Sequence, residues 1–320
     1  MYEWLVMSVL TSFWQRIDFF ELFIKQLPRF YRRQDAILHS IVALLFFASL
    51  LMGTLNAQFF HFTVMDFPTV FLTAVPGLIV VWCVGVLIHA HYQRWGLFLT
   101  SFSQSFLFLV LMCYVICWTI TTPFPPIDRY LLHFDDFFQF STLGLMTWTY
   151  QQHWLIHILN FCYDTWFFQL LLTPLALALF NDRVETDRYF IATFVALFIG
   201  IAIYYFLPTI APAGVLQSQY FSPDQHALVT RFYEVHRFLP VSTYDGGFIA
   251  FPSFHVINCL LVMYAWRRYA WVFLPLLVVN IFSIFSTMAL GYHYLADVLA
   301  AFVIAYASVK LADYLLKRFS

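Results

Sequence analysis

The stretch VFLPLLVVNIFSIFSTMAL, residues 272–290, contains no charged side chain and is long enough to cross a bilayer, whose hydrocarbon core takes about 20 residues of α-helix. Similar stretches recur along the chain, whose 320 residues are 62% hydrophobic and only 10% charged. A water-soluble globule of this composition would expose far too much apolar surface. The sequence therefore predicts an integral membrane protein.

Apolar stretches of this kind predict about eight membrane spans. Their approximate bounds are Ala36–Asn56, Val70–His89, Leu97–Ile120, Trp154–Phe180, Tyr189–Leu207, Phe248–Trp266, Val272–Leu290 and Tyr294–Tyr314. Because lipid offers the backbone no hydrogen-bonding partner, each span is expected to be a helix. We predict an all-α polytopic membrane helix bundle that forms one membrane domain over residues 36–320.

The distribution of positive charge orients these spans. If the N-terminus is cytoplasmic, only Arg129, Arg231 and Arg237 of the 16 Lys and Arg residues fall on the outer side. Cytoplasmic loops of membrane proteins carry an excess of Lys and Arg, so this asymmetry favours the assignment. We expect a multi-pass protein with both termini in the cytoplasm.

The first 35 residues differ from the spans that follow. Residues 13–33, FWQRIDFFELFIKQLPRFYRR, mix aromatic and basic side chains as an interfacial helix does, although a surface helix packed on the bundle fits equally well. Glu3 stands where a signal peptide carries positive charge, so no cleavage is expected. We predict an N-terminal interfacial segment over residues 1–35.

Composition also argues against several classes of site. All five cysteines lie within predicted spans, and none has metal-ligand spacing with a histidine. The formal net charge is −1, and no basic stripe follows the chain. We therefore expect no metal, no cofactor and no nucleic-acid partner.

The first polar cluster is FPSFHVIN, residues 251–258, at the outer end of the sixth predicted span. Proline is tolerated in the first turn of a helix, and Ser253 is of the type that caps free amides there. By itself the pattern indicates a helix start with His255 at the interface. The long outer segments, residues 121–153 and 208–247, are rich in aromatic residues and are expected to fold over this end of the bundle.

The second polar cluster is STMALGYHYLADVLAAF, residues 286–302. His293 and Asp297 are four positions apart, so on a helix they would share a face, and the carboxylate would accept a hydrogen bond from one imidazole nitrogen. Such a contact fixes the tautomer and leaves the other nitrogen free as a nucleophile. The same spacing is also common where two side chains merely stabilise a helix.

Both clusters are predicted at the same depth on the same side of the membrane. Ionisable groups at a membrane boundary are costly unless they are paired or functional. A nucleophilic imidazole on His293, its partner Asp297 and a second imidazole on His255 are what phosphoryl transfer through a covalent intermediate needs.

At these motifs the chain resembles the type 2 phosphatidic acid phosphatase superfamily. PSFH is similar to its P-S-x-H motif, STMALGYHYLAD to its final motif, and the resemblance extends over a catalytic half at residues 189–314. It implies His293 as nucleophile, Asp297 as its orienting partner, His255 as general acid and Ser253 as a hydrogen-bond donor to phosphate. It also implies metal-independent catalysis through a phosphohistidine.

The chain departs from the simple phosphatases of that family at several positions. Thr287 stands where they carry an arginine, Phe254 replaces the glycine of P-S-G-H, and their K-x6-R-P motif is missing. The pattern is closer to the branch that includes inositolphosphorylceramide synthases and related lipid phosphotransferases. The phosphate charge would then be met by other groups, and Arg231 and Arg237 precede FPSFH most closely.

Two acidic features are less specific. Asp164, in NFCYDTWFF, lies inside a predicted span and is a candidate to bind a head-group hydroxyl or to pair with His157, although a structural hydrogen bond is an equal alternative. Asp135 and Asp136 are adjacent, so on a helix they point in different directions. They are interpreted as part of a solvated interfacial face, not a metal site.

The sequence thus predicts a lipid phosphatase or head-group phosphotransferase whose active site is on the non-cytoplasmic side. Its partners would be membrane lipids, namely a phospholipid or lipid-phosphate substrate, with an alcohol as the alternative acceptor to water. The alternative is a transporter or flippase for a phospholipid-like substrate, with the histidines as proton relays. That alternative predicts inverted repeats and broken helices, and the sequence shows no repeat.

Overall fold

A computed structural model describes residues 24–27, 30–31, 33–55, 67–243 and 249–319. Helices make up 79% of the structure, and the described residues contain no strand, which confirms the all-α prediction. Most of the predicted interfacial segment over residues 1–35 lies outside the described residues.

Eight helices correspond to the eight predicted apolar stretches. They are α3 (Arg33–Leu55), α4 (Phe67–His89), α5 (Gln93–Thr119), α8 (His153–Leu179), α9 (Arg183–Phe206), α11 (Phe254–Trp266), α12 (Ala270–Ala289) and α13 (Leu295–Arg318). The connections at one end of the bundle hold α6 (Asp128–Phe137), α7 (Thr142–Tyr150), the short η2 (Pro212–Gly214) and α10 (Pro223–His236).

Five of the described helices are long and apolar enough to cross a membrane, which fits an integral membrane protein. The predicted count of about eight membrane spans is therefore not confirmed by the length and composition of the described helices. Helix α11 has 13 residues, about 20 Å of helix at 1.5 Å per residue, whereas the hydrocarbon core is about 30 Å thick. It is shorter than predicted because it begins after Ser253, not at Phe248.

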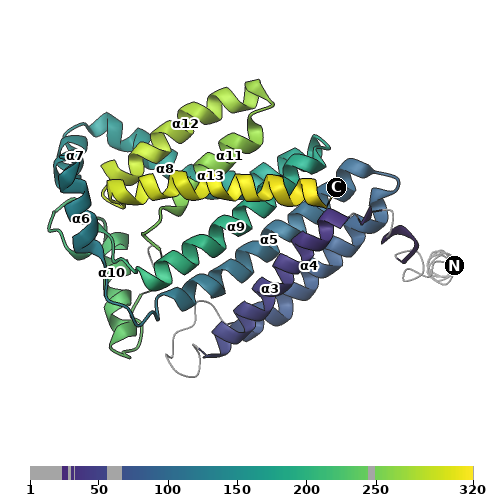
Figure 1. Ribbon diagram of the computed structural model, residues 1–320, viewed down its shortest axis with the longest axis horizontal. Helices are drawn as coiled ribbons and strands as arrows, with labels where there is room; N and C mark the ends of the chain where they lie inside the picture. Colours follow the sequence, from purple (N-terminus) through teal and green to yellow (C-terminus); the bar gives the residue numbers. More distant parts are fainter. Residues whose placement is uncertain (1–23, 28–29, 32, 56–66, 244–248, 320) are drawn as a thin grey trace, which may run out of the picture.

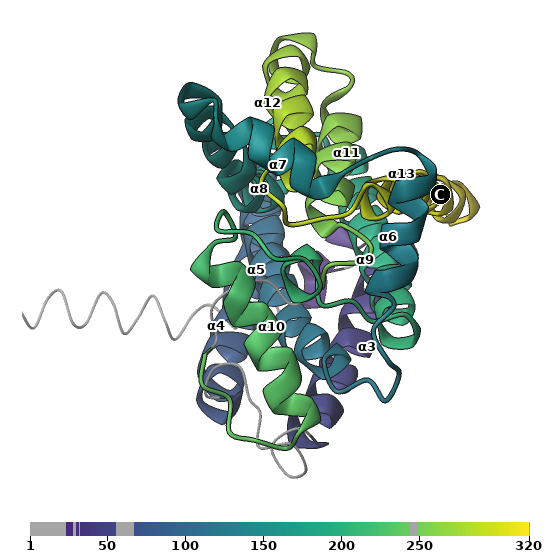
Figure 2. The ribbon, with the colours of Figure 1, turned by 90° about the vertical axis from the view of Figure 1, so that its left-hand side faces the viewer.

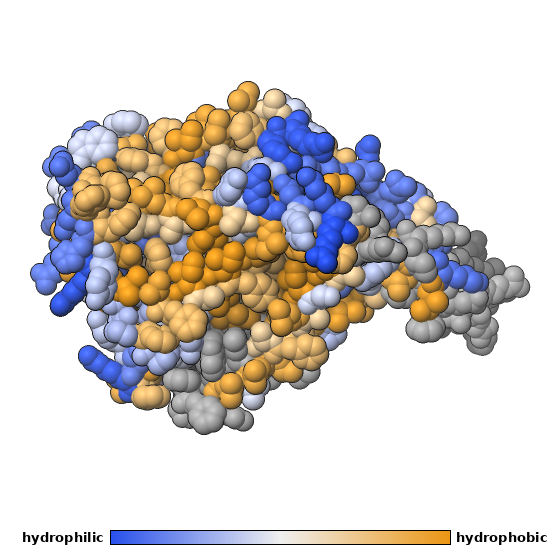
Figure 3. Space-filling view, in the orientation of Figure 1, coloured by the Kyte–Doolittle hydropathy of each residue, from blue (hydrophilic) through white to orange (hydrophobic). Residues whose placement is uncertain are grey.

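The helices form an elongated bundle in which α11 packs against α8, α9, α12 and α13, while α3 and α4 lie along α5. Helices α6, α7 and α10 lie across the end opposite the C-terminus, as Figures 1 and 2 show. In Figure 3, hydrophobic surface covers the middle of the bundle and hydrophilic surface gathers toward its ends. This distribution also fits a protein that spans a membrane.

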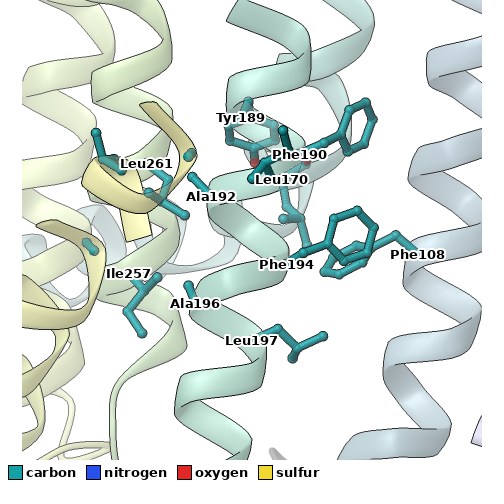
Figure 4. Packing of buried hydrophobic residues seen from close by; sticks show 14 of the residues in the cluster. Phe108, Leu170, Tyr189, Phe190, Ala192, Phe194, Ala196, Leu197, Ile257 and Leu261 are labelled. Carbon is teal, nitrogen blue, oxygen red and sulfur yellow. Dashed lines mark hydrogen bonds between the residues drawn. The ribbon is translucent and has the colours of Figure 1, made fainter. Parts of the chain in front are cut away.

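The core of the bundle is formed by apolar side chains of α5, α8, α9, α11 and α13 (Figure 4). Phe108 of α5 meets Phe194 of α9 edge to face, with ring centroids 4.7 Å apart. Ile257 of α11 is 2% exposed in the same cluster. This packing fixes α11, and with it the PSFH motif at its beginning, against α9.

The opposite end of α11 is held by an ion-pair network. Glu185 of α9 is buried and accepts two hydrogen bonds from Arg267, at 2.8 and 2.9 Å. Arg188 also pairs with Glu185 and reaches Asp313 of α13 at 2.7 Å. Because a buried carboxylate is stable only when it is well paired, this network fixes the α11–α12 turn on α9 and α13.

Candidate functional site

The first component of the site is the beginning of α11. Ser253 is the N-cap residue, and its Oγ accepts a hydrogen bond from the Val256 amide at 3.4 Å. The peptide bond between Phe251 and Pro252 is cis. The Ser253 amide lies 3.4 Å from the carbonyl oxygen of Asp297, so the two sequence motifs are joined directly through the backbone.

The second component is the turn between α12 and α13. Gly291 has a φ of +79°, and a Cβ at this position would lie 2.5 Å from the Met146 sulfur, so the turn needs glycine on both counts. The amides of Tyr292 and His293 both donate to the Thr287 carbonyl, at 3.0 and 2.9 Å. The position of His293 is therefore set by the end of α12.

His293 and Asp297 form a buried pair. The His293 Nδ1 lies 3.0 Å from Asp297 Oδ2, which also accepts the Tyr294 amide at 3.0 Å. The two residues do not share a helix face as their spacing predicts, because α13 begins at Leu295 and Asp297 reaches back from its first turn. With Nδ1–H donating to the carboxylate, the lone pair of Nε2 is left for chemistry.

His255 faces this pair from α11, with the ring centroids of His255 and His293 6.0 Å apart. Two aromatic side chains of α8 hold it there: Tyr163 stacks on the imidazole at 4.3 Å, and the Trp166 ring is 4.6 Å away. Tyr163 also stacks on Tyr292, at 4.5 Å. These contacts were not predicted, because nothing in the sequence of α8 indicates which of its many aromatic residues faces α11.

Helix α6 contacts the beginning of α13, next to His293 and Asp297. The carboxylate of Asp135 accepts the amides of Leu295 and Ala296, at 3.1 and 3.2 Å, in the first turn of α13. Asp128 accepts the Tyr294 hydroxyl and the Ile210 amide, each at 3.0 Å. Burial raises the pKa of both carboxyl groups to about 6.

The position of Asp135 corrects the interpretation that it lies on a solvated face. Asp135 is 1% exposed, whereas its neighbour Asp136 is exposed. The physical reason is that the first amides of a helix have no partner within it, and one of two adjacent carboxylates can point inward to meet them. A sequence signal for this contact would have required knowing that α6 lies against α13.

The other predicted binding residues lie on α8 and α10. Arg231 is fully buried on α10, where its charge acts on Tyr204, and Arg237 is exposed at the C-cap of α10. The Arg237 guanidinium lies 5.6 Å from the centre of the Tyr233 ring. Asp164 is exposed on α8. Among the described residues, no hydrogen bond joins Arg231, Arg237 or Asp164 to His255 or His293.

The described part of the chain shows no cluster of metal-ligating side chains. No group of three or more His, Cys, Asp or Glu side chains in these ranges is arranged to hold an ion.

Comparison with known proteins gives one match. The sequence model of the PAP2 superfamily matches residues 129–311, which is more than half of the chain and extends from α6 into α13. Neither the curated proteins nor the solved structures contain a match to this chain. The PAP2 segment contains His255, His293 and Asp297, whereas α3, α4 and α5 precede it.

Proposed function

This chain belongs to the PAP2 superfamily, whose members are generally phosphatases or phosphotransferases, and on that premise we propose that it cleaves a lipid phosphoester through a phosphohistidine on His293. The observation that carries the proposal is the buried His293–Asp297 pair, at 3.0 Å, facing His255 across the end of the bundle. An imidazole held by a carboxylate on one nitrogen is a nucleophile at the other.

The proposed reaction has two steps. His293 Nε2 forms a bond to phosphorus while the bond from phosphorus to the lipid oxygen breaks, and protonated His255 gives its proton to that oxygen. Asp297 stabilises the positive charge that develops on the His293 ring. Water or an alcohol then attacks the phosphohistidine, His255 takes the proton of the attacking group, and the phosphorus–nitrogen bond breaks.

The phosphate would lie at the beginning of α11. The Ser253 Oγ already accepts an amide proton, so its own hydroxyl proton is available for a phosphate oxygen. The amides and dipole of a helix N-terminus also favour an anion there. We propose Arg231 and Arg237 as the source of positive charge, and Asp164 as the partner of a head-group hydroxyl.

We further propose that the protein is closest to the inositolphosphorylceramide synthase-like branch, with an alcohol as acceptor. Thr287 and Phe254, at positions where the simple phosphatases carry arginine and glycine, support this placement. From the distribution of Lys and Arg, both termini would be cytoplasmic and the site would open on the non-cytoplasmic side.

The test is product analysis of the purified protein with a panel of phospholipids, with and without acceptor alcohols. We expect phosphoester cleavage, a transferred head group when an acceptor is present, and an acid-labile phosphoenzyme. His293→Ala should abolish all three, while His91→Ala, in the exposed turn before α5, should change none. Full activity of His293→Ala would contradict the mechanism. Movement of lipid between leaflets without cleavage would favour the transporter.

A further inference from the structure

A cavity of about 310 Å³ lies inside the bundle next to His255. It is lined by residues of α5, α8, α9 and α11 and by Ile249, and its wall is apolar except at Thr193, His255, Asn258 and the thiol of Cys113. For comparison, a dry apolar cavity of roughly 150 Å³ is enough to bind benzene. The cavity therefore has the chemistry and the size to hold a hydrocarbon segment.

The cavity wall follows α5 and α11 for about two helical turns each. On α11 its wall extends from Phe254 to Leu261, and on α5 from Ile116 to Phe108. At 1.5 Å per residue these stretches correspond to about 10 and 12 Å. Because Phe254 and His255 begin α11, the cavity extends from the proposed reaction site into the membrane interior.

Two features of the wall bear on which lipid chain could enter. Helix α5, which supplies one side, precedes the segment that matches the PAP2 superfamily. Phe254, at the rim beside His255, lies against Gly200 of α9, where a Cβ would be 2.4 Å from the Phe254 Cζ. The ring thus occupies space that only a glycine leaves free.

We propose that this cavity binds one hydrocarbon chain of the lipid substrate, with α5 setting which chain is accepted. The inference rests on the proposed function, and it adds that the enzyme selects its substrate by the hydrocarbon chain of the lipid. A chain that leaves the bilayer for the cavity gains nothing from the hydrophobic effect, since lipid is equally apolar. Selection must therefore come from packing and from the length of the cavity.

Filling the cavity from α5 provides the first test. Cys113→Phe adds a ring to the wall, while Cys83→Phe makes the same change at a half-buried position on α4 outside the cavity. We expect Cys113→Phe to lower kcat/KM for a long-chain lipid phosphate about tenfold, or about 1.4 kcal/mol, while a short-chain water-soluble analogue is turned over as by the wild type. Cys83→Phe should not discriminate. Equal rates on both substrates in Cys113→Phe would overturn the proposal.

A second measurement does not depend on turnover or on how Cys113→Phe folds. A lipid phosphate with a photoreactive diazirine at the end of its chain would be irradiated with the purified wild-type protein, and the labelled peptides mapped by mass spectrometry. We expect label on residues 108–116 of α5. Label confined to the separate groove between α8 and α12, which includes Leu172 and Leu276, would place the chain there and overturn the inference.

Turnover and labelling together separate the two proposals. Absence of phosphoester cleavage with α5 labelled would reject the proposed function and keep the chain site. Cleavage without α5 labelling would keep the proposed function and reject the chain site.

Discussion

Replacing Asp135 by asparagine tests whether helix α6 positions the turn that bears His293 and Asp297. The Asp135 carboxylate accepts the amides of Leu295 and Ala296, at 3.1 and 3.2 Å. An asparagine side chain has one oxygen to accept one of these amides, and its NH₂ group would face the other. Asp297 follows in the same helical turn, so a shift of this turn should misplace the carboxylate that holds His293.

The magnitude follows from these two contacts. A buried amide left without a partner costs about 1–3 kcal/mol. We therefore expect Asp135→Asn to lower the unfolding free energy by roughly 2 kcal/mol. We also expect kcat to fall about tenfold, because a small displacement of an oriented catalytic group has effects of that size or larger.

The assay compares Asp135→Asn with Asp136→Asn, a matched control that loses the same charge at an exposed neighbour. Thermal unfolding in detergent and initial rates on a lipid phosphate should both change for Asp135→Asn. Asp136→Asn should stay within about 0.5 kcal/mol of the wild type, as surface substitutions usually do. Equal effects of the two variants, or a destabilised Asp135→Asn with an unchanged kcat, would refute the positioning role.

Three further predictions concern pH, backbone geometry and orientation. Burial raises the pKa of Asp128 and Asp135 from 3.8 to about 6, so between these values the folded state holds more protons than the unfolded state. Their contribution to stability should then fall as pH rises through that window, and Asp135→Asn should show a shallower decline in unfolding temperature than the wild type; identical slopes would contradict this. Gly291→Ala should lower the unfolding temperature and kcat together, because φ at this position is +79° and the added Cβ would clash with the Met146 sulfur of α7. Wild-type values for both would show that the turn tolerates a side chain. Leu239→Cys should react with an impermeant thiol reagent added outside intact cells and Lys317→Cys should not, and the reverse pattern would invert the proposed topology.

The eight apolar helices and the two motifs could be predicted from the sequence, whereas α6, α7 and α10 in the outer segments were not. The predicted span over residues 272–290 corresponds to α12 (Ala270–Ala289), because lipid requires backbone groups to bond within one helix. Ser253 was expected to cap a helix and does so, because a serine before an apolar run meets free amides locally. Such features depend on neighbours in the chain, so a single sequence contains them.

The surroundings of the motifs could not be read in this way. Tyr163 stacks on His255 across more than ninety positions of sequence, and Asp135 reaches Leu295 across 160. In a membrane helix nearly every face is apolar, so the periodicity that identifies the buried face of a soluble helix is weak. The sequence by itself determined the eight apolar helical segments and identified His255, His293 and Asp297 as candidates for the chemistry. The tertiary structure alone decided which helix faces meet, and so the partners of His255, the inward turn of Asp135 and the cavity along α5.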